Sequence, residues 1–422
     1  DFVTASLARP LAVSRFRALW IASVVSNVGG FFQSVAAAWL MLELTNGSPV
    51  WVAAMAASTT LPLLFLALPS GALADLANRR NVLLATQFTM LGSVLGMTGF
   101  ALADAMTPQL LLAFGLVLGV GTAFNAPVWM AMVPDLVPRE MLADAVALNA
   151  VSFNAARAVG PALGGIVVAV AGPGIAFAIN AATYTGVIAV VLSFKAADWQ
   201  PQEAAPMSQA IVAGVRYVRF SPELLWLLGL AAGFALTSAS LLVLLPNVTQ
   251  AALKGGATTY GLLLGAMGLG ALVGALVRGR AQSALGRRTV AVGIALFGAA
   301  GVGVGLSRYP WLTAVLMAAA GVVWVWALTT LNATIQTLAA SWVRGRALGM
   351  YTLAFSGVWP LGSLLAGGVA DTIGAPWAVV ALCGGATLVG IAAWRMPIVG
   401  MGDVSAPVTP EGGESHGTEQ AV

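Results

Sequence analysis

Cysteine and histidine are almost absent from this chain of 422 residues, which contains one of each, Cys383 and His416. A single cysteine excludes a disulfide within the chain, and the two residues together are too few for a cysteine- or histidine-based metal site. His416 lies in a tail (397–422) whose Gly, Glu, Ser and Pro content predicts disorder. We therefore expect no metal, no other cofactor and no histidine proton relay.

Charge is also scarce. Charged residues make up 8% of the sequence against 59% hydrophobic residues, and the mean hydropathy is +0.92. So few polar groups cannot cover a soluble particle of this size, which predicts an integral membrane protein. No basic stretch is interleaved with aromatics, which argues against nucleic-acid binding, and no GxxxxGK[ST] phosphate loop occurs. We expect a protein that is not an enzyme and does not hydrolyse ATP.

The apolar runs are much longer than the roughly 10 residues of a membrane barrel strand, so they predict helices. Twelve stretches of roughly 20 apolar residues are bounded by charge, Pro or Gly. The sequence therefore predicts an all-α integral membrane protein with twelve transmembrane helices. The predicted spans are 17–42, 49–72, 81–104, 108–132, 143–170, 174–194, 223–249, 258–278, 288–307, 310–338, 346–370 and 375–396.

A short charged segment occurs twice, about half the chain apart. Arg79-Arg80 follows Gly71 at the spacing at which Arg287-Arg288 follows Gly279, and we expect a loop at both places. Such long-period similarity in a membrane protein predicts two homologous six-helix halves, related by pseudo-symmetry. The copies differ at one position, where Asp75 of the first is matched by a serine in the second.

The arginines and lysines predict the orientation, because cytoplasmic loops collect positive charge. With both termini inside, only Lys254 and Arg308 lie outside, and Arg157 falls within the fifth helix. We expect a multi-pass protein of the cell inner membrane. The predicted organisation is a cytoplasmic N-terminal segment (1–16), a first half (17–194), a cytoplasmic linker with an amphipathic helix (195–222), a second half (223–396) and a disordered cytoplasmic tail (397–422).

The segment Gly71-Ala-Leu73-Ala-Asp75 with Arg79 and Arg80 resembles the signature G-x-L-x-D-R-x-G-R-R/K of the major facilitator superfamily. Leu76 and Asn78 depart from that signature. The run Gly160-Pro161-Ala-Leu-Gly164-Gly165 is similar to the core of the exporter motif in that superfamily. The pattern around Asp135, Asn154, Arg157 and Arg344-Gly-Arg346 looks most like its enterobactin-exporter-like and macrolide-efflux-like branch.

The resemblance implies the major facilitator fold, with two halves that rock about a central cavity. It also implies a cytoplasmic latch, in which the Asp75 carboxylate favours the outward-open state by lying near a helix N-terminus of the other half. The alternative is a solvated turn that only obeys the positive-inside rule. The candidate latch residues are Gly71, Asp75, Arg79, Arg80, Asp135, Arg139, Arg287, Arg288, Arg344 and Arg346.

Arg157 carries the sharpest functional hypothesis. A guanidinium at mid-bilayer costs at least roughly 2.5–3.5 kcal/mol on insertion scales, so it faces a cavity or has a partner. Either it attracts an anionic group of the cargo, or it is a structural arginine bonded to carbonyls or loop acids. Other polar or aromatic residues are candidates for the same cavity, with interhelical hydrogen bonding as the alternative. The full substrate-binding set is Asn27, Ser34, Phe153, Asn154, Arg157, Trp326, Thr330, Asn332, Thr334 and Trp359.

The predicted function is secondary active export of amphipathic, anionic or zwitterionic small molecules such as siderophores or drugs. Export would proceed by alternating access, coupled to H⁺. No acid lies at the depth of Arg157, which leaves Asp75, Glu43 and Asp371 as coupling candidates. We expect a monomer whose partners are its small-molecule substrate and membrane lipids. A lipid or lysophospholipid flippase and a facilitative uniporter of the same fold are the alternatives.

Overall fold

The computed structural model describes residues 9–194, 219–339 and 343–395 of the chain. The predicted disordered tail lies outside these residues, as does almost all of the predicted linker with its amphipathic helix. Within the described residues all regular structure is helical, and twelve helical segments are long and apolar enough to cross a membrane. Each of the twelve predicted spans corresponds to one of these segments, so the predicted fold class is confirmed.

The first half contains the short helices η1 and η2 and five long helices. Proline at the first helical position begins α3 and α5, and the Asn78 side chain caps α4 by accepting the Asn81 N–H (3.3 Å). The bounds are η1 Arg9–Ala12, α2 Ser14–Leu44, α3 Pro49–Leu76, α4 Arg79–Leu102, α5 Pro108–Leu136, η2 Arg139–Met141 and α6 Leu142–Ser193.

One expected loop differs in this half. The expected loop over 71–80 is mostly helical, because nothing in 71–76 stops a helix and α3 continues to Leu76 before α4 begins at Arg79. The fifth and sixth spans are separate, as predicted, and meet at a kink within α6. Gly172 separates them with a φ of 83°, a backbone conformation that favours glycine.

The second half follows the same plan with two additional breaks. A short helix, α9, follows α8, and the eleventh span is interrupted by a π-helical turn. The expected loop over 279–288 is again mostly helical. The bounds are α8 Pro222–Val243, α9 Leu245–Ala251, α10 Ala257–Leu285, η3 Gly286–Arg288, α11 Thr289–Leu306, α12 Pro310–Leu338, α13 Arg344–Thr352, the π turn η4 Leu353–Gly357, α14 Trp359–Ile373 and α15 Ala375–Arg395.

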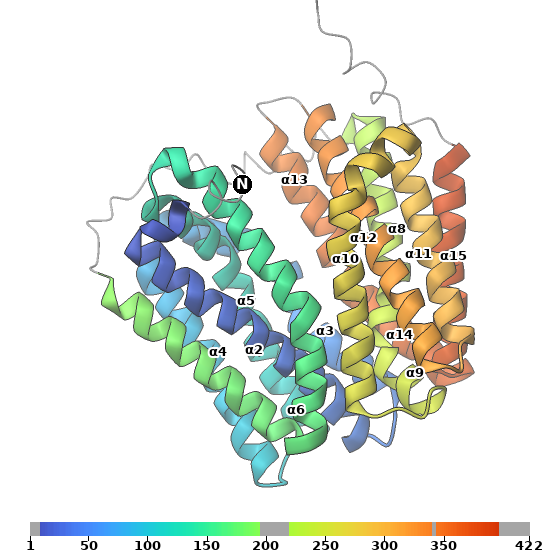
Figure 1. The fold of residues 1–422 in the computed structure, drawn as a ribbon, viewed down its shortest axis with the longest axis horizontal. Coiled ribbons are helices and arrows are strands. Elements are labelled where there is room, and N and C mark those ends of the chain that lie inside the picture. Colours follow the sequence, from blue (N-terminus) through green and yellow to red (C-terminus); the bar gives the residue numbers. More distant parts are fainter. Residues whose placement is uncertain (1–8, 195–218, 340–342, 396–422) are drawn as a thin grey trace, which may run out of the picture.

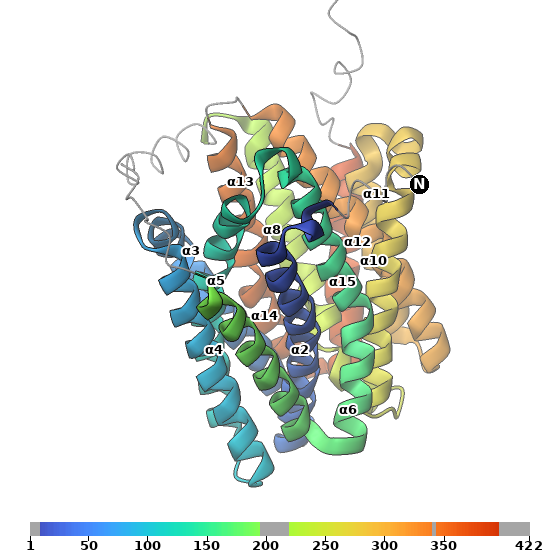
Figure 2. The ribbon, with the colours of Figure 1, turned by 60° about the vertical axis from the view of Figure 1, so that its left-hand side comes forward.

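The two halves lie side by side, with α2–α6 in one bundle and α8–α15 in the other (Figure 1). Within each half the long helices pack on one another, as α2 does on α6 and α11 on α15. Two helix pairs make the most extensive contact between the halves: α6 with α10, which Figure 2 shows next to each other, and α3 with α14. We call the α6–α10 contact the seam.

Small residues allow the seam to form. A Cβ atom on Gly165 would lie 2.5 Å from the Ala257 carbonyl oxygen, and one on Gly268 would lie 2.6 Å from Ala158 Cα. The α3–α14 pair is similar, because a Cβ on Gly367 would lie 2.5 Å from Ala53 Cβ. Close backbone approach at small residues is the usual way in which membrane helices pack.

Candidate functional site: a cavity between the two halves

A cavity of about 310 Å³ lies between the halves. Its walls come from α2, α3 and α6 of the first half and from α8, α10 and α14 of the second. Most of the lining is apolar. The lining residues are Phe31, Ser34, Ala37, Ala38, Val52, Met55, Ala56, Thr59, Thr60, Arg157, Pro161, Leu242, Val243, Tyr260, Leu264, Met267, Gly268 and Trp359.

Arg157 is the cation of this cavity. Its side chain is half-buried, and no hydrogen bond or ion pair joins its guanidinium to another described residue. The backbone of α6 is fixed at this point, since a Cβ on Gly268 of α10 would lie 2.5 Å from the Arg157 carbonyl oxygen. The guanidinium therefore lies on the wall of an apolar cavity without a partner among the described residues.

The hydroxyl groups of the lining donate to their own helices. Ser34 donates to the Phe31 carbonyl oxygen (2.9 Å), and Thr59 and Thr60 both donate to the Ala56 carbonyl oxygen (3.0 Å each). Such bonds leave these oxygens available to the cavity as acceptors only. Ser34 was a predicted cavity residue, whereas the two threonines were not.

Trp359 forms part of an aromatic wall on the second half. Its ring is perpendicular to that of Trp324, with centroids 5.7 Å apart, and 5.9 Å from the ring of Phe355. Trp324 in turn contacts Phe234 and Phe297, at 5.3 and 5.2 Å. Because these neighbours are packed in the core, the Trp359 ring is held in place before any ligand arrives.

On one side of the molecule, residues of the two halves contact each other directly. The Trp39 ring of α2 stacks on the Tyr260 ring of α10, with centroids 6.2 Å apart, and the Trp39 indole N–H donates to the Glu43 carboxylate (2.7 Å). The Asn247 amide of α9 also donates to the Gly47 carbonyl oxygen (2.8 Å). We call this side of the molecule the closed end.

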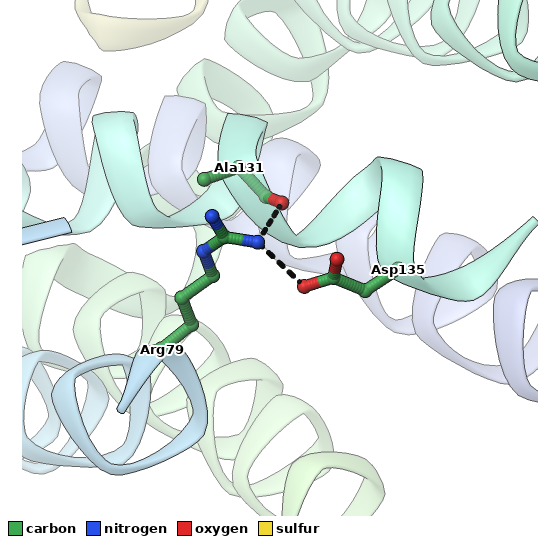
Figure 3. A network of polar contacts seen from close by, with 3 residues as sticks. All are labelled: Arg79, Ala131 and Asp135. Atoms are coloured by element: carbon green, nitrogen blue, oxygen red, sulfur yellow. Dashed lines mark hydrogen bonds and ion pairs between the residues drawn. The ribbon is translucent and has the colours of Figure 1, made fainter. Parts of the chain in front are cut away.

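The other side carries the repeated arginines, and we call it the arginine end. Arg79 donates to the Asp135 carboxylate (2.9 Å) and to the Ala131 carbonyl oxygen (3.2 Å), which ties the start of α4 to the end of α5 (Figure 3). All three residues belong to the first half. Among the described side chains no ion pair crosses between the halves at this end.

The second arginine of each copy contacts the last helix of its own half. Arg80 donates to the carbonyl oxygens of Val191 and Leu192 at the end of α6 (3.2 and 3.1 Å). Arg288 lies over the Trp394 ring at the end of α15, 4.4 Å from its centroid. In both halves this arginine therefore joins the start of the third membrane helix to the end of the sixth.

The structure describes only some of the other predicted latch residues. The side chains of Asp75 and Arg287 lie outside the described part of the structure, so the latch that the resemblance implies stays a prediction. Gly71 lies within α3 next to open space, and Arg139 is exposed in η2. Arg344 and Arg346 begin α13.

Of the predicted substrate-binding residues, Ser34, Arg157 and Trp359 line the cavity. Phe153 contacts the lining residue Phe31, with ring centroids 5.9 Å apart. Asn154 donates to the Ala150 carbonyl oxygen on its own helix (2.8 Å), and Asn27 is half-buried on α2.

The predicted residues of α12 lie away from this cavity. Trp326 donates to the Gly274 carbonyl oxygen (3.1 Å), and Thr330 contacts Gln282, so this face of α12 packs against α10. Thr334 donates to the Thr330 carbonyl oxygen (2.8 Å), and Asn332 accepts from Gln336 (2.6 Å). Trp326 and Thr330 therefore make interhelical hydrogen bonds to α10, which is the alternative considered above.

The motif residues Gly160, Pro161, Gly164 and Gly165 lie where α6 meets two other helices. Cβ atoms on Gly160 and Gly164 would lie 2.7 Å from Phe31 Cβ and 2.9 Å from Phe32 Cα on α2. The Pro161 carbonyl oxygen and Gly165 instead face α10 across the seam. This motif therefore lets α6 approach its own half and the other half at the same level.

Sequence reasoning missed Phe31, Tyr260 and the role of Trp39. Trp39 and Glu43 are four residues apart, a spacing that brings helical side chains together, so this pair was detectable. Asp371 is exposed near the end of α14, and Glu43 is exposed at the closed end. No acid lines the cavity, and no cluster of potential metal ligands occurs among the described residues.

The chain is similar in sequence to a known protein family and to several named transporters. The model of the transmembrane secretion effector family matches residues 4–409. The multidrug efflux pump Tap of Mycolicibacterium fortuitum is 28% identical over 89% of this chain and 94% of its own length. The staphyloferrin A transporter of Staphylococcus aureus is 23% identical over 82% and 87%, and the enterobactin exporter EntS of Shigella boydii 27% over 49% and 50%.

Solved structures agree on the fold. The nucleoside transporter NupG superposes with a TM-score of 0.69 at 12% identity, covering 91% of this chain and 100% of that one. The POT family transporter PepTSo gives a TM-score of 0.70, also at 12% identity, covering 90% and 97%. The predicted resemblance is thus confirmed: the chain is a membrane transporter that belongs to the transmembrane secretion effector family of the major facilitator superfamily.

Proposed function

We propose that this protein is a secondary active exporter that moves amphipathic small molecules, siderophore- or drug-like and anionic or zwitterionic, out of the cytoplasm. The relatives with efflux or export in their names support the direction and the size class of the cargo. Transport uses alternating access and is coupled to H⁺. The protein acts as a monomer in the inner membrane, with the arginine end and both termini in the cytoplasm, as the positive-inside rule favours.

The observation that carries the proposal is the guanidinium of Arg157, which lies on the cavity wall without a partner among the described residues. An isolated charge within a membrane helix is costly, and a structural arginine would recover part of that cost through a partner. The described residues supply no such partner, and no acid lines the cavity. An anionic cargo group is the counter-charge that fits this arrangement.

Alternating access is supported by the unequal ends of the molecule. At the closed end, Trp39 stacks on Tyr260 and Asn247 bonds to Gly47, both across the halves. At the arginine end the two bundles diverge in Figure 1, and the Arg79–Asp135 ion pair stays within one half. This is the arrangement expected of a transporter that is open to the cytoplasm and closed to the outside.

Proton coupling must use groups outside the cavity lining. Glu43 is the strongest described candidate, because its carboxylate accepts the hydrogen bond that orients Trp39 against Tyr260. Protonation of Glu43 removes the charge from that bond and weakens the closed end. Asp371 is exposed, and the Asp75 side chain lies outside the described part. Asp75 and Asp371 stay candidates from the sequence.

The test is flux of charged and neutral compounds in proteoliposomes under an imposed pH gradient. We expect Arg157→Ala to abolish export of an anionic substrate while thermal unfolding stays close to wild type. Arg308→Ala, which removes an exposed arginine at the closed end, is the matched control and should transport normally. Undiminished transport of anions by Arg157→Ala would contradict the proposed role.

A lysophospholipid flippase is the second candidate, because an apolar cavity with one cation also fits an acyl chain and its phosphate group. Adding a fluorescent lysophospholipid to the same proteoliposomes separates the two. Gradient-independent movement of the lipid, without export of soluble anions, would favour the flippase.

A further inference from the structure

The cavity offers few hydrogen-bond donors to a ligand. The hydroxyl protons of Ser34, Thr59 and Thr60 are already given to backbone carbonyl oxygens. The Arg157 guanidinium, the Tyr260 phenol and the Trp359 indole N–H make no hydrogen bond to another described residue. A ligand that satisfies this lining is rich in acceptors at one point and apolar elsewhere.

Arg157 and Trp359 differ in the half to which they belong and in the group that they recognise. Arg157 is on α6 of the first half and offers a planar fork of N–H donors, which matches a carboxylate, phenolate or sulfonate. Trp359 is on α14 of the second half and offers a half-exposed ring. A ring presented to an apolar cavity favours a flat aromatic partner over a puckered aliphatic one.

The Trp359 ring is held in position by its neighbours before a ligand binds. This residue begins α14 directly after the π turn over Leu353–Gly357, a type of irregularity that is frequent at functional sites. Its ring is supported by Trp324 at 89° and by Phe355 at 46°. A preorganised ring loses little entropy when a ligand binds, so its contact contributes more to affinity.

We infer that this cavity selects planar aromatic acids, whose anionic group is bound by Arg157 and whose ring stacks on Trp359. The inference rests on the proposed function, in that the cavity is the cargo site. It goes beyond it by naming the aromatic acid as the cargo class and Trp359 as a specificity-determining residue. Because the two contacts lie on different halves, a bound aromatic acid bridges the halves, which a simple anion or a neutral arene does not.

The test measures binding to the purified full-length protein by isothermal titration calorimetry with four probes. The probes are 2-naphthoate, the neutral 2-naphthylmethanol, the saturated acid decahydro-2-naphthoate and the cation 2-naphthylmethylammonium. We expect 2-naphthoate to bind about tenfold or more tightly than the alcohol and about threefold or more tightly than the saturated acid, and the cation not to bind.

Two variants assign the contacts. Arg157→Gln should remove the preference for naphthoate over the alcohol, and Trp359→Leu should remove the preference for naphthoate over the saturated acid. Each should leave the other preference intact. The controls are Arg308→Gln and Trp377→Leu, which change an exposed arginine and an exposed tryptophan away from the cavity. Arg157→Lys, which keeps the charge, tests the site if Arg157→Gln does not fold.

Equal affinity for naphthoate and its saturated analogue, or preferences that survive both variants, would overturn the inference. Its failure is separable from that of the proposed function. Binding with these preferences but without export in proteoliposomes would leave the site intact and refute the exporter. Export that neither variant changes would refute the aromatic-acid site and leave the exporter function intact.

Discussion

The seam between α6 and α10 makes a quantitative prediction for Gly261→Ala. A Cβ atom on Gly261 would lie well inside van der Waals contact with the Pro161 carbonyl oxygen, 2.8 Å from Gly165 Cα and 3.0 Å from Gly165 N. All three obstructing atoms are backbone, so no side-chain rotation relieves the overlap. The helices must move apart, which opens the contact between the two halves.

The expected cost follows from this overlap. Forcing an extra methyl group into a packed site costs about 1–3 kcal/mol. Replacing glycine by alanine at an unstrained helical position returns about 0.4–1 kcal/mol through the unfolded state. A net loss of about 1–2 kcal/mol corresponds to a change of about 5–30-fold in a two-state equilibrium. This net value applies to unfolding and sets the expected fall in Tm. The unfolded-state contribution cancels between two folded conformations, so the overlap alone, about 1–3 kcal/mol, lowers the population of the conformation described above.

Gly186→Ala is the matched control, since it lies on α6 and a Cβ there would meet nothing within 4 Å. The assay is a pair of spin labels on exposed Ala105 and Lys254, one on each half at the closed end, in a background without Cys383. Gly261→Ala should populate a longer distance and lower the Tm, whereas Gly186→Ala should do neither. Identical distance distributions and Tm values for the two variants would refute the packing argument.

Three further predictions concern polar contacts. Trp39→Phe keeps a smaller aromatic ring against Tyr260 but removes the N–H that Glu43 accepts at 2.7 Å, so the closed end should weaken about fivefold or more, roughly 1 kcal/mol, in the same distance measurement. Glu43→Gln, which retains an acceptor, should have a smaller effect. Asp135→Asn removes the ion pair with Arg79, but its carboxylate is 54% exposed, so unfolding should be destabilised by at most about 1 kcal/mol, and less at high salt. Asp75→Asn should shift the population toward the inward-open state if Asp75 is the latch, and unchanged distances between the halves would contradict that role.

The membrane spans were predictable because hydrocarbon imposes length and composition on each one separately. The ends of α3 and α10 were not, since both helices continue beyond their apolar stretch to Leu76 and Leu285 where no residue stops them. The short connection between the fifth and sixth spans is made by one residue, because Gly172 at positive φ is enough to turn the chain.

The candidate site was only partly predictable for a related reason. Helical periodicity shows which side chains share a face, but it does not show what that face contacts. Trp326 and Thr330 do share a face, and that face packs on α10. Arg157 was predictable because a charge within an apolar span is visible in the sequence itself and requires a cavity or a partner whatever its neighbours are. The contact between Trp39 and Tyr260 joins distant parts of the chain and has no local signal.

The second arginine of each repeat has a mechanical consequence. Arg80 bonds to the end of α6 and Arg288 lies on the end of α15, so in each bundle two helices are fastened together at one extremity. These contacts favour movement of each bundle as a unit, because its third and sixth membrane helices cannot separate at the arginine end without losing them. The two contacts differ in chemistry: hydrogen bonds to carbonyl oxygens hold the first bundle, and a cation–π contact holds the second. A substitution of Trp394 therefore removes the contact in the second bundle and leaves the hydrogen bonds of Arg80 in the first bundle in place.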